Sequence, residues 1–128
     1  IEGIKFINDS KATNVDSVVV ALKSFEEPIF LNLGGQDKGN DYSMIEDIVI
    51  EKVKESYAIG SSAEKVFNYF HSKVKTEIKK DFDDVINTAL SEAREGDVVL
   101  LSPACASFDM FDNYEHRGKV FKSIINNK

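Results

Sequence analysis

The sequence has a single cysteine, no long apolar run, and fewer basic than acidic residues. One cysteine excludes an internal disulfide, so the disulfide-built folds of small secreted proteins are excluded and a reducing cytoplasm is expected. No apolar run approaches the roughly 20 residues that cross a membrane, and no charged-then-apolar leader is present. The formal net charge is −6, which argues against a nucleic-acid or membrane partner because either requires a basic face.

Several sequence patterns of catalysis are also missing. The chain contains neither the phosphate loop G-x-x-x-x-G-K-[ST] nor the serine-nucleophile elbow G-x-S-x-G. His71 and His116 have no second histidine or cysteine at a metal-binding spacing. We therefore interpret Cys105 as buried packing, His71 as the end of a helix, and Glu115-His116-Arg117 as a solvated helix face. No catalytic residue and no metal ligand is assigned in this chain.

What the sequence does contain is an alternation of short apolar strands and amphipathic helices. At 128 residues, without repeats or linkers, the chain is predicted to form one domain over residues 1–128. Because it does not begin with methionine, we expect it to be part of a longer protein. The predicted strands are Ile4–Ile7, Ile29–Leu33, Val53–Ile59, Val74–Ile78 and Val98–Leu101.

The segments between these strands have helical spacing of apolar residues. Thr13 and Asn14 are cap candidates for the first helix, which carries Val15 to Phe25. Ser43 with Glu46, and Ser61 with Glu64, are interpreted as capping boxes that open the next two helices. Asp81 is expected to cap a helix that ends before Gly96, and the last helix is predicted to carry Phe111, Tyr114, Phe121, Ile124 and Ile125.

Single helices between strands predict an α/β fold: a three-layer domain with a mostly parallel sheet of about five or six strands. Ligands of such sheets bind beyond the carboxyl ends of the strands. Unusual residue combinations occur at three of these exits: Asn8–Asn14, Gly34–Ser43 and Ser102–Tyr114.

Each exit has a functional and a structural interpretation. Asp9, Ser10 and Lys11 offer a carboxylate, a hydroxyl and an ammonium to a ligand, or merely precede a helix cap. Gly34 and Gly35 permit positive φ and close approach to an anion beside Lys38, or form a simple turn. In the third exit, Ser107 offers a hydroxyl and an N–H near a predicted helix start. From the residues alone, the conclusion is an α/β domain with a small anion-binding edge.

Taken together, the three exits resemble the C-terminal domain of the Mur ligases, in particular the branch that adds D-glutamate. The runs that carry the resemblance are Asn8-Asp9-Ser10-Lys11-Ala12-Thr13-Asn14, Gly34-Gly35-Gln36-Asp37-Lys38-Gly39 and Leu101-Ser102-Pro103-Ala104-Cys105-Ala106-Ser107. They occur in the family's order and spacing over nearly the whole chain. Sister ligases typically have an aspartate-tyrosine-alanine-histidine type of sequence where this chain has Asp9–Thr13.

The resemblance implies a Rossmann-like domain of a three-domain cytoplasmic enzyme. An N-terminal domain would hold UDP-N-acetylmuramoyl-L-alanine, and a central domain would hold ATP and Mg²⁺. ATP would phosphorylate the alanyl carboxylate, and the amine of D-glutamate would attack the acyl phosphate. This chain would bring the amino acid and close over ATP, and would be inactive by itself.

The resemblance also implies roles for individual residues. Thr13 and Lys38 would hold the α-carboxylate of D-glutamate, and Ser107 with the backbone at Tyr114 would hold its side-chain carboxylate. Asp9, Lys11 and Asn14 would face the nucleotide. Two alternatives stay open: a sister ligase domain for another amino acid, and a non-catalytic α/β anion-binding module.

Overall fold

The computed structural model describes residues 3–37, 39–105, 107 and 110–128. In this part of the chain five strands form one sheet, in the order β1-β5-β2-β3-β4. Every neighbouring pair is parallel. The strands are β1 (Lys5–Asn8), β2 (Ile29–Gly34), β3 (Val53–Ile59), β4 (Lys75–Ile78) and β5 (Val98–Leu101). The predicted parallel sheet is confirmed, with each strand found within a residue of its expected bounds.

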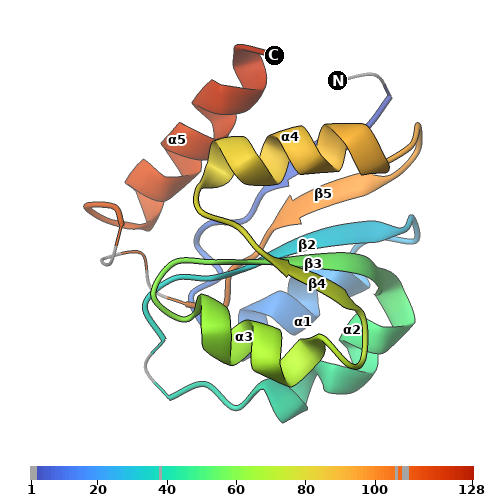
Figure 1. Cartoon of the computed structure of the whole chain (residues 1–128), viewed down its shortest axis with the longest axis vertical. Helices are drawn as coiled ribbons and strands as arrows, with labels where there is room; N and C mark the ends of the chain where they lie inside the picture. Colours follow the sequence, from blue (N-terminus) through green and yellow to red (C-terminus); the bar gives the residue numbers. More distant parts are fainter. Residues whose placement is uncertain (1–2, 38, 106, 108–109) are drawn as a thin grey trace.

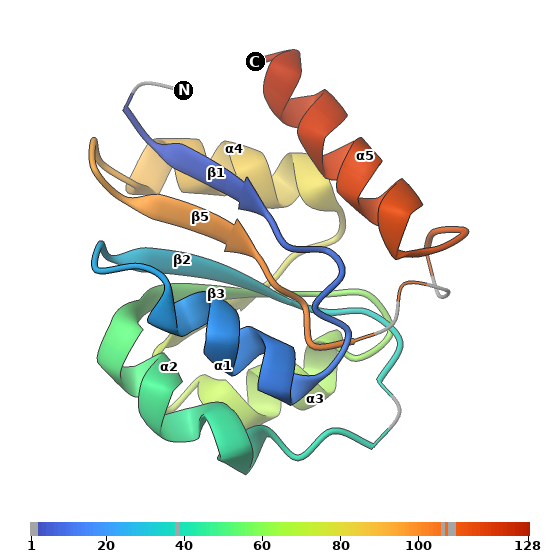
Figure 2. The ribbon, with the colours of Figure 1, turned by 180° about the vertical axis from the view of Figure 1, so that it is seen from behind.

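Helices cover both faces of the sheet and complete the three layers (Figures 1 and 2). One face carries α1 (Val15–Lys23), α2 (Glu46–Lys52) and α3 (Ala63–Phe70), with the short 3-10 helix η1 (Tyr42–Ile45) before α2. The other face carries α4 (Phe82–Glu92) and α5 (Tyr114–Asn126). No helix among the described residues combines the length and apolarity needed to cross a bilayer.

The hydrophobic core is divided by the sheet into two clusters. Leu22, Val49 and Phe70 pack with Leu31 under the α1–α3 layer. Phe30, Val99 and Phe121 pack under α4 and α5. The central strands β2 and β5 are buried along their whole length, because helices cover them on both sides. This explains why their sequences are nearly continuous apolar runs rather than alternating ones.

Two of the expected helix caps are confirmed and two are wrong. Asn14 accepts a hydrogen bond from the backbone N–H of Ser17, and Asp81 accepts one from Asp84. Ser43, in contrast, is not a cap: Asp41 caps the 3-10 helix and also accepts the Ser43 hydroxyl. Ser61 donates its hydroxyl to the carbonyl of Gly35 instead of capping α3. Ser43 lies within the 3-10 helix and Ser61 between β3 and α3, and in both places another hydrogen-bond partner competes with the local cap.

The last helix begins later than the apolar pattern indicates. Helix α5 starts at Tyr114, where the side chain of Asn113 caps it by accepting from His116 N–H. Phe111 therefore lies in the preceding loop, although its ring still stacks on Phe82, with ring centroids 5.5 Å apart. Periodicity alone does not distinguish an apolar loop residue from a helical one when both contact the same core.

Candidate functional site

The three strand exits meet at one edge of the sheet. The strands β1, β5 and β2 are adjacent, so the loops that follow them lie side by side (Figure 2). Backbone bonds join them: Ala104 N–H donates to the carbonyl of Ala12 at 2.9 Å, and Gly34 N–H donates to the carbonyl of Pro103 at 2.9 Å. The parallel topology and these bonds bring together segments that are up to ninety residues apart.

The first exit presents two exposed side chains above a fixed backbone. Asp9 N–H donates to the carbonyl of Leu101, and its carboxylate accepts the hydroxyl of Ser102 at 3.1 Å. Lys11 and Thr13 are exposed. Asn14 has the structural role of helix cap, whereas Thr13 makes no such cap bond among the described residues. An exposed hydroxyl beside the start of α1 is a suitable donor to a carboxylate.

A buried arginine ties the first exit to the third. Arg117 of α5 is 2% exposed. Its Nε donates to Ser10 Oγ at 2.8 Å, its Nη2 to the Ser10 carbonyl at 2.6 Å, and its Nη1 to the Cys105 carbonyl at 2.9 Å. Three directed bonds from one planar guanidinium fix both loops relative to α5.

The expectation that Glu115-His116-Arg117 is a solvated face is therefore wrong for Arg117, although His116 is exposed. The spacing of residues along the helix could have indicated that Arg117 is buried. Arg117 precedes the buried Phe121 by four residues, and residues four apart on a helix share a face. A charged residue on an apolar stripe indicates a buried group with partners.

Ser10 connects the arginine to the start of α5. Its hydroxyl donates to the carbonyl of Tyr114 at 2.6 Å while it accepts from Arg117. The backbone of Tyr114 is thus held against the first exit, and its side chain is 44% exposed. Tyr114 opens a helix of 13 residues, whose N-terminal N–H groups favour an anion.

The second exit depends on glycine and on a buried aspartate. Gly34 and Gly35 have φ of 118° and 135°, which confirms the expected positive φ. A Cβ on Gly34 would collide with the backbone carbonyl of Ile59. Lys38, the predicted carboxylate-binding lysine of this loop, lies outside the described residues.

Asp37 organises the rest of that loop. Its carboxylate accepts from the N–H groups of Gly39 and Asn40, from Tyr42 OH at 2.8 Å, and from Lys65 Nζ at 2.9 Å. Burial opposes ionisation, but these donors outweigh it and lower the pKa of Asp37 to about 2. The loop is therefore held in one shape by a carboxylate that is fully ionised at neutral pH.

Cys105 packs beneath the second and third exits, as expected. Its thiol is 1% exposed. It contacts Tyr42 OH at 3.4 Å and Ser62 Oγ at 3.7 Å. Burial raises the pKa of this thiol, so it is protonated at neutral pH and is a poor nucleophile. Asn40 reinforces the same contact by donating to the carbonyl of Ala104.

The third exit does not enter a helix directly, contrary to expectation. Ser107 is 1% exposed, and its carbonyl accepts from the N–H groups of Met110 and Phe111. The loop then reaches α5 only at Tyr114. Ser107 is therefore not at a helix start, although it remains between the strand exit and α5. Its neighbours Ala106, Phe108 and Asp109 lie outside the described residues.

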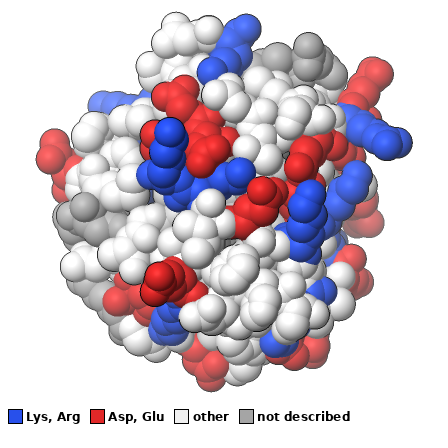
Figure 3. All heavy atoms as spheres, in the orientation of Figure 1, with Lys and Arg blue, Asp and Glu red and all other residues white. Residues whose placement is uncertain are grey.

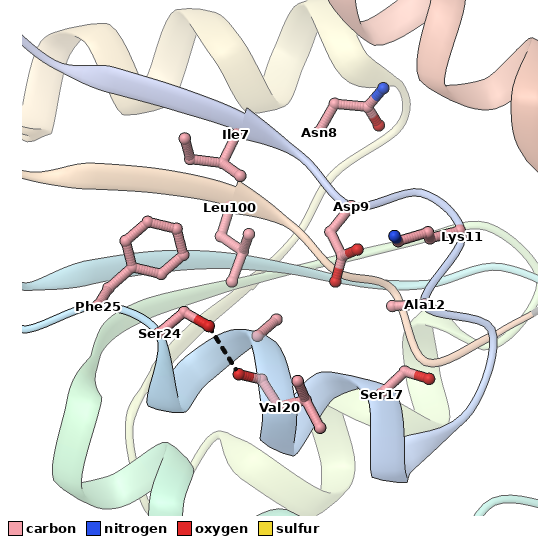
Figure 4. A pocket seen from close by; sticks show the side chains of 11 residues that line it. Ile7, Asn8, Asp9, Lys11, Ala12, Ser17, Val20, Ser24, Phe25 and Leu100 are labelled. Carbon is pink, nitrogen blue, oxygen red and sulfur yellow. Dashed lines mark hydrogen bonds between the residues drawn. The ribbon is translucent and has the colours of Figure 1, made fainter.

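Two hollows flank the first exit. One, of about 490 Å³, extends along β1 and α1; Figure 4 shows Asp9 and Lys11 at its end, with Phe25 and Ile7 farther along it. The other, of about 300 Å³, lies between the first exit and α5 and includes Lys11, Lys119 and Lys122. Lys11 contributes to both, so this edge is locally basic on an acidic protein. On the face seen in Figure 3, acidic and basic side chains are otherwise interspersed.

Fold and site together define a parallel α/β domain whose three strand exits meet at one edge, and solved structures share this fold. A murein peptide ligase from Psychrobacter arcticus matches all of this chain and 28% of its own, with a TM-score of 0.57 and 10% identity. E. coli FolC, solved in complex with DHPP and ADP, matches 90% of this chain and 27% of its own, with a TM-score of 0.59 and 14% identity.

The family is shown by sequence. The model of the Mur ligase glutamate ligase domain matches residues 1–105, and the chain belongs to the Mur ligase family. Proteins called UDP-N-acetylmuramoylalanine–D-glutamate ligase are similar to it. The protein of Cytophaga hutchinsonii is 54% identical, in a match that covers 98% of this chain and 28% of that protein. The protein of Salinibacter ruber is 45% identical, in a match that covers 98% of this chain and 27% of that protein. The chain corresponds to the C-terminal domain of these relatives and spans less than a third of their length.

Proposed function

We propose that this chain is the amino-acid-binding domain of an ATP-dependent ligase that adds D-glutamate to UDP-N-acetylmuramoyl-L-alanine during peptidoglycan precursor synthesis in the bacterial cytoplasm. The observation that carries the proposal is the meeting of three strand exits at one edge, in a chain whose relatives bear that activity in their names. A dicarboxylate requires several donors and positive charge, and in this proposal Thr13, Lys38 and the start of α5 supply them.

The proposed roles follow the edge from α1 to α5. Thr13 and Lys38 hold the α-carboxylate of D-glutamate, while Ser107 and the backbone at Tyr114 hold its side-chain carboxylate. Asp9, Lys11 and Asn14 face the nucleotide. None of these groups acts as a general acid or base. They position the amine for attack on an acyl phosphate, a contribution that rests on orientation and charge.

Mg²⁺ does not fit the described residues at this edge. The described carboxylates of the three exits do not gather as a set of three metal ligands. Asp9 accepts from Ser102, Asp37 from Lys65 and Tyr42, and Asp41 from Ser43, while Asp112 is exposed. We therefore propose that a central domain of the longer polypeptide holds Mg²⁺ and makes most of the ATP contacts. The sequence contains no phosphate loop, so we expect no ligation by this chain alone.

The test is a titration of the ¹⁵N-labelled chain with D-glutamate, followed by amide shifts, with L-glutamate and glycine as controls. We expect shifts at the three exits with D-glutamate, reduced by Thr13→Ala. Equal responses to all three amino acids would favour the non-catalytic anion-binding module, and a stronger response to a different amino acid would favour a sister ligase. Amide product formed from ATP and both substrates by this chain alone would contradict the division of labour.

A further inference from the structure

Three glutamates converge on one side of the sheet, away from the strand exits. Glu55 and Tyr57 are two residues apart on β3 and therefore share a face, and Tyr57 pairs with Glu77 of β4. Glu92, the last residue of α4, covers them. One carboxylate oxygen from each glutamate lies within 4.8 Å of the others. No described residue of the three exits belongs to this cluster.

Buried oxygens in this cluster lack hydrogen-bond partners. Within the described part of the chain, Tyr57 OH and Glu77 Oε2 are buried and make no hydrogen bond. Glu55 Oε1 makes none either, but it is ion-paired with Lys75 Nζ at 3.4 Å. Tyr57 is fully buried, and the charges of all three glutamates raise the pKa of its phenol, after burial itself. Tyr57 shares a strand face with Glu55 and pairs with Glu77, so its buried phenol lies on the same side of the sheet as these carboxylates. A buried polar atom left unpaired costs about 1–3 kcal/mol, so two such oxygens beside three carboxylates indicate a group that belongs between them.

The lysines beside the cluster do not fill it. Lys75 Nζ is 3.4 Å from Glu55 and 3.3 Å from Glu92, but its side chain is 58% exposed. Lys79 Nζ lies 3.4 Å from a carboxylate oxygen of Glu77 and 3.8 Å from one of Asp84. Two ammonium groups thus face four carboxylates. Burial and then the neighbouring Glu92 raise the pKa of Glu55 to about 7, a sign that negative charge there is in excess.

We propose that Glu55, Glu77, Glu92 and the phenol oxygen of Tyr57 form a binding site for a hard divalent cation, for which the ammonium of Lys75 is an exchangeable substitute. An all-oxygen set selects ions of the Mg²⁺, Mn²⁺ and Ca²⁺ class over zinc or copper. Such ions bind oxygen at roughly 2.0–2.6 Å, so ligands on opposite sides of one ion lie about as far apart as these oxygens. The bound ion joins the edge strand β4 to the end of α4.

The lysine makes the test sharp, because removing it is expected to strengthen binding. We expect Mn²⁺, added to the full 128-residue chain, to broaden the amide signals of β3, β4 and the end of α4. Lys75→Met should tighten Mn²⁺ binding about tenfold, and Glu92→Gln should weaken it about tenfold or more. Tyr57→Phe should weaken it less. Glu64→Gln, an exposed glutamate of α3, is the matched control and should change nothing.

Calcium and magnesium added in parallel should raise the melting temperature of the wild-type chain and of Lys75→Met, and not that of Glu92→Gln. Circular dichroism checks that each variant is folded. If Glu92→Gln does not fold, Lys75→Met still tests the proposal. Absence of local broadening in both wild type and Lys75→Met at millimolar Mn²⁺ would overturn the proposal in favour of ordered water. Equal affinity of Glu92→Gln and Glu64→Gln would overturn it as well. Neither result bears on D-glutamate binding.

Discussion

The guanidinium of Arg117 holds Ser10 at two points, donating to its hydroxyl at 2.8 Å and to its carbonyl at 2.6 Å. Ser10 in turn donates to the carbonyl of Tyr114, one helical turn before the arginine. This closed arrangement sets the distance between the first exit and the start of α5. It therefore positions both ends of the proposed dicarboxylate site without touching the ligand.

Replacing Arg117 should destabilise the fold. Arg117→Met removes the three donations to the carbonyls of Ser10 and Cys105 and to the Ser10 hydroxyl, which keeps only its bond to Tyr114. The expected cost is about 2–4 kcal/mol. Arg117→Lys should recover only part of the lost stability, because an ammonium does not reproduce the planar set of guanidinium donors. The free energy of unfolding from urea titration measures both. The exposed Lys119→Met is the control, with a change within about 0.5 kcal/mol; a similar small value for Arg117→Met would contradict the role.

Asp37 should make stability depend on acid pH. Its folded pKa of about 2 lies below the ordinary aspartate value of 3.8, so its contribution is complete above about pH 4 and is lost as pH falls towards 2. The shift corresponds to at most about 2 kcal/mol. Asp37→Asn should be less stable at neutral pH and should flatten the decline between pH 4 and 2. Asp16→Asn, an exposed substitution on α1, should leave the decline as it is. An unchanged slope in Asp37→Asn would show that other carboxylates cause it.

Substituting two glycines of the second exit should distinguish the cost of backbone strain from the cost of a steric collision. Gly34 and Gly39 both have positive φ, 118° and 93°, but a Cβ on Gly34 meets the Ile59 carbonyl, whereas nothing lies within 4 Å of one on Gly39. Gly39→Ala should cost about 1 kcal/mol from conformation alone. Gly34→Ala should cost clearly more, about 3 kcal/mol or above. Thermal unfolding measures the difference, and equal losses would mean that the contact at Ile59 relaxes freely.

Adjacent residues of the first exit should separate stability from binding. Asn14→Ala removes the cap bond to Ser17 N–H and should cost about 1 kcal/mol. Thr13→Ala removes an exposed hydroxyl and should change stability by less than about 0.5 kcal/mol, while it weakens the response to D-glutamate. Urea titration and amide shifts, made on both variants, check this. Loss of stability in Thr13→Ala together with unchanged binding would reverse the assignment.

Much of the architecture was predictable because its signals are local. The apolar runs Ile29–Leu33 and Val98–Leu101 predicted strands buried on both faces, and both are central in the sheet. Asn14 and Asp81 were identified as caps because a cap bond spans only three residues. Ser43 and Ser61 were misassigned because their hydroxyls found other partners, Asp41 in the same turn and Gly35 in a distant loop.

The sequence by itself determined the α/β class, the order of elements and the family, since these depend on periodicity and on residues next to one another in the chain. It also predicted that the three strand exits lie at one edge, because strand exits of a parallel sheet share one side. Only the tertiary structure decided that Arg117 is buried between Ser10 and Cys105, and that Glu55, Glu77 and Glu92 converge around Tyr57. Such contacts join residues from different elements, and their energies depend on burial, which no local pattern specifies.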